Sequence, residues 1–137
     1  MADNGKILAQ LLPSDTSNDT VLYTVPSAAA STISHSTIGG LTVAVAPKAV
    51  SANTKTIITA ITVCNVHSGA VTFNMRLKES SSVGDNDKEY LFYTNSVTNA
   101  NTAILNLNLP LTAGNILKVK PSVASKLAFN VFGIEVT

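Results

Sequence analysis

Tryptophan is absent from this 137-residue chain, cysteine occurs once, and aromatic residues make up only 5% of it. The single cysteine, Cys64, cannot form a disulfide within the chain, so the fold does not depend on an oxidising compartment. Charged residues are also scarce, at 12%, which is about half of the ~25% usual in soluble domains. Thr, Ser and Asn fill the polar positions instead. A surface so poor in charge is suited to being covered by copies of itself or by a partner.

Other absences remove support from whole classes of function. The formal net charge is +1 and no block of basic residues occurs, so we expect no nucleic-acid partner. No apolar run approaches the ~20 residues that span a bilayer, so we expect no membrane partner. The first residues lack the charged and then apolar layout of a signal peptide, which indicates synthesis and folding in a cytoplasm.

The residue types that carry catalysis do not cluster. Neither His35 nor His67 has a second His or Cys at the spacing of metal ligands. No serine lies in a G-x-S-x-G motif, and Cys64 lies in an apolar strand, where we expect a buried, unreactive thiol. Because no pair of nucleophile and base can be named, the sequence predicts no enzyme activity, no cofactor, no metal site and no small-molecule substrate.

Two short clusters have alternative interpretations. Residues 85–87, Asp-Asn-Asp, with Glu89 form either a solvated turn or a weak cation site, but they lack the Gly and the distal Glu of an EF-hand. Tyr90, Phe92 and Tyr93 are the one aromatic cluster. We expect these rings in the core and at its rim, whereas a carbohydrate-binding platform needs exposed rings.

Strand patterns dominate the chain and helix patterns are nearly missing. Val71, Phe73, Met75 and Leu77 alternate with polar residues without a fault, which is the pattern of a half-buried antiparallel strand. The same reasoning predicts strands near residues 6–12, 20–25, 41–46, 56–66, 70–78, 88–94, 102–109, 115–120 and 126–136. Short strands at this spacing predict an all-β fold in one domain over residues 1–137: a single antiparallel β-sandwich, jelly-roll-like, with about eight or nine strands.

The connections and the two most apolar strands give finer predictions. The turn residues His67-Ser68-Gly69 predict a hairpin between 56–66 and 70–78. The strand 56–66 is apolar on both sides, as is 126–136, so we expect both strands to be central and covered twice. The second cover is either a loop of this chain or a neighbouring subunit. The expected sides are Ile57, Ile61 and Val63 against Ile58, Ala60 and Cys64 in one strand, and Phe129 and Val131 against Phe132, Ile134 and Val136 in the other.

The stretch D-T-V-L-Y-T-V-P, residues 19–26, predicts a strand with Val21, Tyr23 and Val25 on one face, which Pro26 ends. The segment 27–54 that follows is soft and holds one clean short strand. It is either an added hairpin packed on its own domain or an arm that pairs with the edge of a neighbouring copy. The residues that we expect to make oligomer or lattice contacts in this segment are Ile33, Leu41, Val43 and Val45.

Five motifs resemble, in order and spacing, those of small virion structural proteins of tailed bacteriophages. They are the 19–26 strand, I-T-V-C-N at 61–65, K-E-Y-L-F-Y at 88–93, L-T-A-G-N at 111–115 and F-N-V-F-G-I-E at 129–135. The resemblance covers most of residues 8–137. This chain departs from the family pattern at 27–54, because relatives pass almost directly from the first motif into the next strand.

The resemblance implies a β-sandwich without enzyme activity on a virus particle. Members of this family are described as capsid decoration or cement proteins and as tail- or fibre-associated proteins. We therefore expect a virion protein, assembled in the bacterial host cytoplasm, that forms a homo-oligomer, by resemblance a trimer, and binds the major capsid protein to stabilise the assembled head. The alternative is a structural or receptor-binding protein of the tail or fibre.

Overall fold

A computed structural model describes residues 5–27, 34–38, 41–45, 54–79 and 86–136, and of residues 34–38 and 41–45 it describes the backbone alone. The elements in these ranges are ten β-strands and one turn of 3-10 helix, η1 (Asp87–Glu89). No helix in the described ranges is long and apolar enough to cross a membrane.

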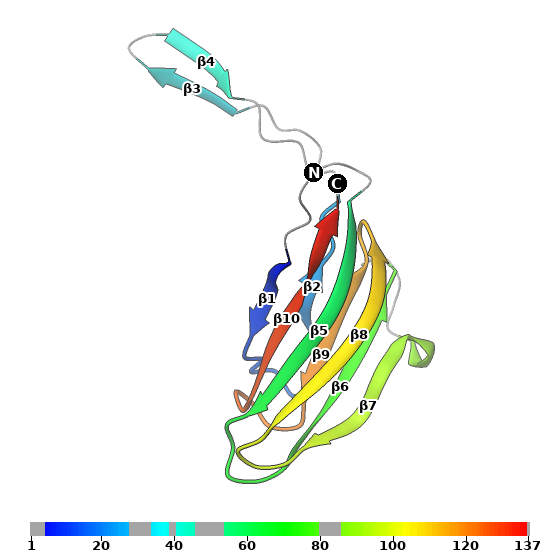
Figure 1. The fold of residues 1–137 in the computed structure, drawn as a ribbon. Helices are drawn as coiled ribbons and strands as arrows, with labels where there is room; N and C mark the ends of the chain where they lie inside the picture. Colours follow the sequence, from blue (N-terminus) through cyan, green and yellow to red (C-terminus); the bar gives the residue numbers. More distant parts are fainter. Residues whose placement is uncertain (1–4, 28–33, 39–40, 46–53, 80–85, 137) are drawn as a thin grey trace.

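Eight of the strands form a sandwich of two four-stranded antiparallel sheets (Figure 1). The first sheet has the order β1-β10-β5-β8 and the second has the order β2-β9-β6-β7. The strands of the first sheet are β1 (Lys6–Leu11), β10 (Leu127–Val136), β5 (Lys55–Asn65) and β8 (Thr102–Thr112). Those of the second are β2 (Thr20–Thr24), β9 (Ile116–Pro121), β6 (Val71–Lys78) and β7 (Tyr90–Val97). The β-sandwich predicted from the sequence is confirmed.

The strand pairing is nested. β1 pairs with β10, β2 with β9, β5 with β8, and β6 with β7. First with last, second with second-to-last, is the order of one long hairpin folded over on itself, which is a jelly roll. Both strands that the sequence predicts to be covered on two faces, β5 and β10, are central in the first sheet.

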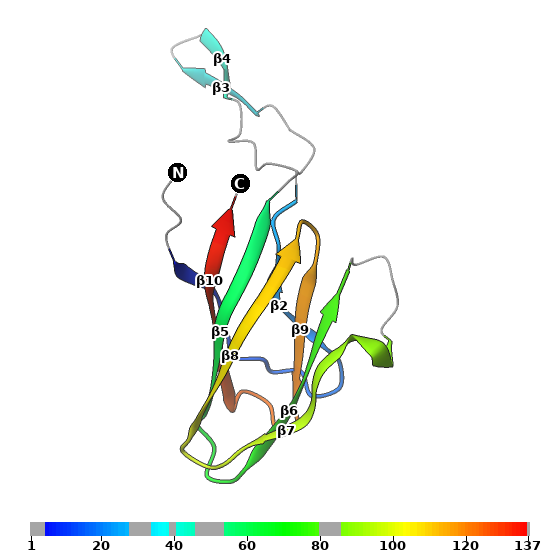
Figure 2. The ribbon, with the colours of Figure 1, turned by 45° about the vertical axis from the view of Figure 1, so that its right-hand side comes forward.

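The two remaining strands, β3 (Ser34–Ile38) and β4 (Leu41–Val45), form a separate hairpin within the segment 27–54. Among the described strands they pair with each other and with no strand of the sandwich. Figures 1 and 2 both show them beyond the end of the sandwich at which the C-terminus lies. β4 agrees with the predicted strand at 41–46, and β3 was not predicted.

The core fills the space between the two sheets. Phe73 of the second sheet meets Phe129 of the first edge to face, with ring centroids 5.5 Å apart. Full burial of one such apolar side chain stabilises the fold by about 1.5–3 kcal/mol. The largest fully buried side chains are Phe73, Phe129, Ile58, Ile61, Met75, Leu111, Leu117, Leu127, Val25, Val63, Val71 and Val119.

The predicted hairpin between 56–66 and 70–78 is wrong, because β5 and β6 lie in different sheets. The connection crosses from one sheet to the other, and the buried Asn65 side chain organises the crossing. Its Nδ2 donates to the carbonyl oxygens of Gly69 (2.9 Å), Val97 (2.8 Å) and Thr98 (3.1 Å), and its Oδ1 accepts from the backbone N–H of His67 (2.8 Å). The turn residues were identified correctly, but turn chemistry does not say which sheet the next strand joins.

Bulges correct two predictions of which side chains share a face. In β5 the register shifts between Ile58 and Ala60 against both of its neighbours. As a result Ile58 is buried with Ile61 and Val63, whereas Ile57 faces outward and is 38% exposed. A strict period of two cannot anticipate this change of phase.

The same effect occurs in β2, where the register against β9 shifts between Val21 and Tyr23. Leu22 and Tyr23 are both buried, and Val21, which we expected beside Tyr23, is 48% exposed. Tyr23 itself packs in the core.

Candidate interaction surfaces

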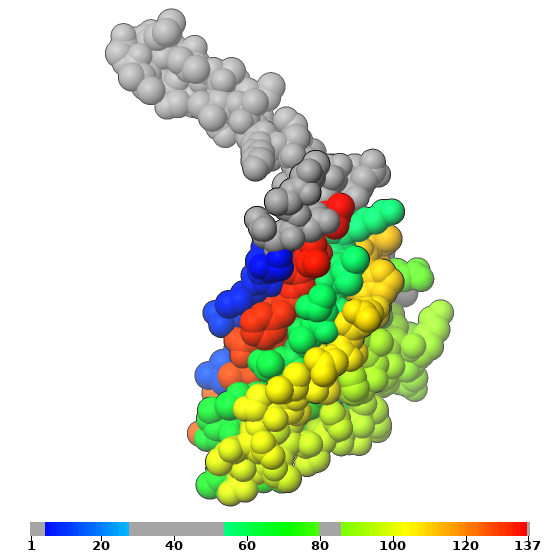
Figure 3. All heavy atoms as spheres, viewed as in Figure 1, coloured from blue at the N-terminus to red at the C-terminus, as the bar shows by residue number. Residues whose placement is uncertain are grey.

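The outer face of the first sheet contains no charged residue over most of its area. The strand segments 7–10, 57–64, 102–110 and 128–134 hold no Asp, Glu, Lys, Arg or His. Charges of these strands lie at one end of the sheet, at Lys6, Lys55 and Glu135. Figure 3 shows this face from outside, with the atoms of β1, β10, β5 and β8 side by side. We call it the neutral face.

Large apolar side chains lie on the neutral face. Ile104 of β8 is 64% exposed and Ile7 of β1 is 54% exposed. Phe132 and Ile134 are half-buried on β10, which lies between β1 and β5. An isolated exposed apolar residue needs no explanation, but several on one uncharged face of a sheet are typical of an interaction surface.

The polar groups of the neutral face bond to one another across the strands. Gln10 Nε2 donates to Asn130 Oδ1 at 2.8 Å, and Asn130 Nδ2 donates to Thr62 Oγ1 at 3.3 Å. This row links β1, β10 and β5. Amides and hydroxyls that already have partners cost less to remove from water than charges do, so the face can be covered without leaving a buried charge unpaired.

A shallow hollow of about 300 Å³ lies on the neutral face between β1 and β5, lined in part by Ile7, Thr59, Phe132 and Ile134. Its floor is Gly133. A Cβ added to Gly133 would lie 2.3 Å from the carbonyl oxygen of Ile57 and 2.8 Å from Leu8 Cδ1. Bulges in β1 and β5 flank this glycine, and the β5 backbone and the Leu8 side chain come so close to Gly133 that no side chain fits there.

The contact residues predicted in the segment 27–54 stay predictions. Ile33 lies outside the described residues, and for Leu41, Val43 and Val45 the structure describes the backbone alone. The register of β4 places these three at alternate positions, opposite Ile38, Ser36 and Ser34 of β3. Alternate positions of a strand share one face, so the three belong to the same side of the hairpin.

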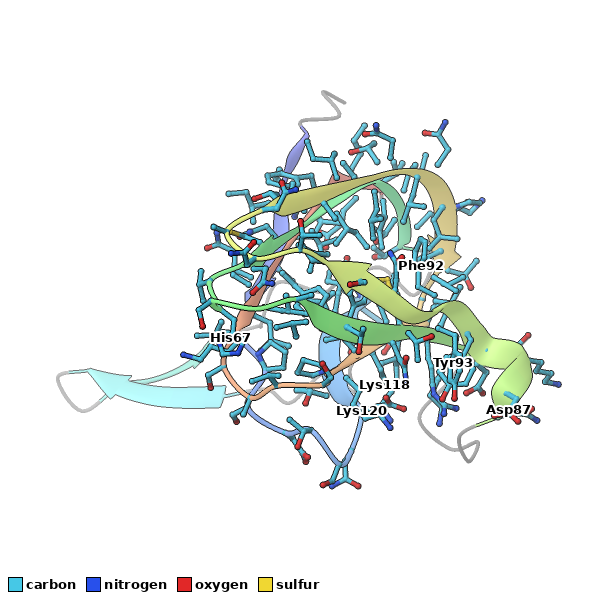
Figure 4. All side chains as sticks on the ribbon, turned by 90° about the horizontal axis from the view of Figure 1, so that it is seen from below. His67, Asp87, Phe92, Tyr93, Lys118 and Lys120 are labelled. Atoms are coloured by element: carbon cyan, nitrogen blue, oxygen red, sulfur yellow. The ribbon has the colours of Figure 1, made fainter. Side chains whose placement is uncertain are left out.

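The outer face of the second sheet is different, because it carries charge that is tied into the structure. Arg76 Nε lies 3.0 Å from the Asp19 carboxylate, with 11% and 5% of the two side chains exposed. Arg76 also donates to the carbonyl oxygen of Asn86 (3.1 Å) and to the Tyr90 hydroxyl, and its guanidinium carbon lies 3.9 Å from the centre of the Tyr90 ring. Figure 4 shows Lys118 and Lys120 on this outer side as well.

A polar cluster joins the two sheets at the end of the sandwich. The Tyr23 hydroxyl donates to Glu135 at 2.7 Å and lies 3.0 Å from the Thr56 hydroxyl, and Lys6 bonds to the other Glu135 oxygen. Burial, followed by the bond to Glu135, raises the pKa of Tyr23 well above its ordinary value. Burial acts to raise the pKa of Glu135, but the hydrogen bonds from Lys6 and Tyr23 outweigh it and hold that pKa below its usual value.

The acidic stretch around η1 is a capped turn in its described part. Asp85 lies outside the described residues. Asn86 caps η1: its side chain accepts from the Lys88 N–H at 3.3 Å, and its own N–H donates to Glu89 at 3.1 Å. These bonds give the oxygens of Asn86 and Glu89 a structural role in the turn. Within the described ranges, no three His, Cys, Asp or Glu side chains gather where they could hold a metal ion.

The aromatic cluster on β7 divides between inside and outside. Phe92 packs against the core with its ring centre 6.3 Å from that of Phe73, as expected for a core residue. Tyr93 is 65% exposed, and Figure 4 shows it on the opposite side of β7 from Phe92. The expectation of core and rim positions therefore fails for Tyr93.

The cysteine and the described histidine lie apart. Cys64 is half-buried on β5, in an outward position of the neutral face, so the expected place in the core is wrong. Its neighbours in the sequence, Val63 and Asn65, are the buried ones. His67 lies in the crossing that follows β5, away from Asp87 at the other end of the second sheet (Figure 4).

No family model, curated protein or solved structure matches this chain. The neutral face is the feature that the sequence reasoning missed. Its signal was present as four strand segments without a charged residue, but the pairing of those four in one sheet becomes visible only in the structure.

Proposed function

We propose that this protein is a structural virion protein without catalytic activity, a decoration or cement protein that binds the assembled head of a tailed bacteriophage. The observation that carries the proposal is the neutral face, because a wide uncharged sheet surface is suited to burial against other protein. The order of the five sequence motifs supports the phage context, and jelly rolls are common in viral shells.

In this proposal the neutral face covers a site on the major capsid protein or a neighbouring copy. A protein that binds only the assembled lattice stabilises it by RT ln(1 + [L]/Kd), about 3–4 kcal/mol per site at 100–1,000 times Kd. That gain is repeated at every site on the shell. Hydroxyl and amide side chains suit contacts made by hydrogen bonding with little desolvation of charge.

The hairpin β3–β4 supplies the second contact. A two-stranded hairpin alone is marginally stable in water, so it needs a partner surface. We propose that it pairs with the edge of a neighbouring copy and that the protein forms a homotrimer. Deletion of residues 28–53 is expected to lower the oligomer mass in sedimentation experiments, and an unchanged mass would contradict the arm.

The location is tested on purified particles. Heads and tails are separated, and the protein is sought in each fraction by mass spectrometry. We expect it in the heads, and we expect heads that have lost it to break under milder denaturing conditions. Recovery in the tail fraction alone, or a shell whose strength does not change, would contradict the decoration role.

The neutral face is tested with a matched pair of variants. Ile104→Lys places a charge on the neutral face, and Val66→Lys places one at a residue of similar exposure, 59%, in the crossing after β5. Because a charge buried without a partner is costly, we expect Ile104→Lys to weaken binding to stripped heads at least about tenfold. Val66→Lys is expected to bind like the natural protein. Equal binding by both variants would contradict the role of the neutral face as the surface that binds the head.

A further inference from the structure

Tyr93 is held outward by an unusual stretch of backbone in β7. Phe73 pairs with Asn95 and Met75 with Phe92, so Tyr93 and Thr94 together stand opposite the single residue Asn74. Thr94 adopts a φ of 48°, which is rare for a β-branched residue. The Asn74 side chain stabilises this bulge by accepting from the Thr94 N–H at 2.7 Å. Strain of this kind persists where the surrounding structure fixes it, and it is concentrated at functional sites.

The bulge sets Tyr93 against a second ring that is itself fixed. The Tyr93 and Tyr90 rings meet edge to face with centroids 4.8 Å apart. Arg76 lies over Tyr90, and Asp19 and the carbonyl oxygen of Asn86 hold Arg76 in place. These contacts fix the Tyr90 ring on which Tyr93 packs, and a binding surface that is held in place beforehand lowers the entropy that binding costs.

The two rings and Asp87 line an open hollow of about 290 Å³. Asp87 is exposed on η1 beside them. The hollow thus combines an aromatic surface with a carboxylate that accepts hydrogen bonds. A sugar offers the complementary pair, since one side of its ring is made of C–H groups and its edge carries hydroxyl donors.

We propose that Tyr93, Tyr90 and Asp87 form a binding site for a neutral saccharide. The Tyr93 ring packs on the C–H side of the sugar, and Asp87 accepts from its hydroxyls. The negative charge of Asp87 disfavours uronic and other acidic sugars. This site goes beyond the assembly role, because it lies on the second sheet and uses none of the residues of the neutral face.

A protein partner fits this surface less well. The cores of protein interfaces are depleted in charge, whereas Tyr93 shares its hollow with Asp87, and Arg76 lies over the neighbouring Tyr90 ring. Figure 4 shows Lys118 on the same side. The neutral face, on the opposite sheet, is the surface that we propose to bind other protein.

The test uses the full chain and the methyl glycosides of glucose, galactose, mannose, N-acetylglucosamine and glucuronic acid. Binding is measured by saturation-transfer NMR and by titration. We expect at least one neutral glycoside to bind with a Kd on the order of 1 mM and the glucuronide to bind at least about tenfold more weakly.

The variants distinguish the contribution of the Tyr93 ring from that of its hydroxyl, and both from a loss of folding. Tyr93→Ala is expected to weaken saccharide binding at least about tenfold, and Tyr93→Phe less than about threefold, because stacking needs the ring alone. Asp87→Asn is expected to weaken saccharide binding by about threefold or more. Ile104→Ala, on the neutral face, is the matched control and is expected to bind like the natural protein. Thermal melting of each variant checks that it is folded.

Three results would overturn the proposal. They are no binding of any neutral glycoside at concentrations up to about 50 mM, binding that survives Tyr93→Ala, and loss of attachment to heads in Tyr93→Ala without saccharide binding by the natural protein. The last result would make Tyr93 a protein contact. Head binding by the natural protein is measured separately, so failure of this site leaves the decoration role standing.

Discussion

The two outer faces of the sandwich differ in the side chains that they carry. The neutral face holds isoleucine, phenylalanine, amides and hydroxyls, whereas the outer face of the second sheet holds Arg76, Lys118 and Lys120. Arg76 is fixed by Asp19, Asn86 and Tyr90, so charge on that face contributes to the fold itself. The absence of charge on the neutral face does not stabilise an isolated chain. It lowers the cost of desolvation when another molecule covers the face. One face therefore maintains the protomer, and the other is suited to assembly.

The largest expected effect comes from Gly133, on which the close packing of the first sheet depends. Gly133→Ala forces a Cβ to within 2.3 Å of a backbone oxygen, so we expect a loss of about 3 kcal/mol or more in the free energy of unfolding. Chemical denaturation measures it. Gly69→Ala is the control, because its added Cβ meets nothing closer than 3.7 Å, and we expect a change below about 1 kcal/mol. Similar losses for both variants would show that the close approach at Gly133 is unimportant.

Removing charge from the second sheet is expected to be nearly as damaging. Arg76→Ala leaves the carboxylate of Asp19, only 5% exposed, without its partner. Breaking a largely buried pair in this way costs about 3 kcal/mol. Adding charge to the neutral face by Ile104→Lys is expected to change stability by less than about 0.5 kcal/mol while it weakens assembly. If Ile104→Lys destabilised the protomer as much as Arg76→Ala, the contrast between the faces would fail.

The smallest effect concerns the cluster that joins the two sheets, and it depends on pH. Tyr23→Phe removes the hydrogen bond to Glu135, and we expect a cost of about 1.5 kcal/mol near pH 7. Glu135 has a lowered pKa in the folded protein, so its contribution is present above the unfolded value of about 4.3 and is lost as the pH falls further. Tyr23 has a raised pKa, so its contribution is present below about pH 10 and is lost as the pH rises beyond it.

Denaturation of the natural protein and Tyr23→Phe across pH checks this prediction. The difference between them is expected to be constant from about pH 5 to 9 and to shrink at both extremes. Tyr93→Phe, altered at an exposed tyrosine, is expected to match the natural protein throughout. A difference that stayed constant to pH 3 and to pH 11 would refute the role of the cluster.

Local patterns were sufficient to predict the elements of the sandwich. All eight of its strands lie where alternation placed them, although β7 (Tyr90–Val97) begins and ends later than the predicted 88–94 and β8 (Thr102–Thr112) is longer than 102–109. β3 was missed because S-H-S-T-I has too few apolar residues to alternate. The pairing of the strands was harder to predict from the sequence, because the turn residues His67-Ser68-Gly69 suit a hairpin and a crossing between sheets equally.

The candidate sites were harder to predict than the strands. The neutral face needs the nested pairing that brings residues 7–10 beside 128–134 and 57–64 beside 102–110. The exposure of Tyr93 depends on a bulge, and a bulge reverses the inside and outside positions that a period of two assigns. Residues 80–85 and the side chains of the hairpin lie outside the described residues, so the predictions for Asp85 and for Leu41, Val43 and Val45 stay open.

The nested pairing also decides when this chain can fold. β10 is synthesised last among the strands, yet it is inserted between β1 and β5, and both of its edges are used. Until residue 136 has left the ribosome, β1 lacks the strand with which it pairs, and β5 lacks a partner on the edge that β10 later occupies. Within the sandwich, β6 and β7 are the only paired strands that follow each other directly in the sequence, so they can form their hydrogen bonds early. The protein therefore completes its first sheet, and with it the neutral face, only once β10 has been synthesised.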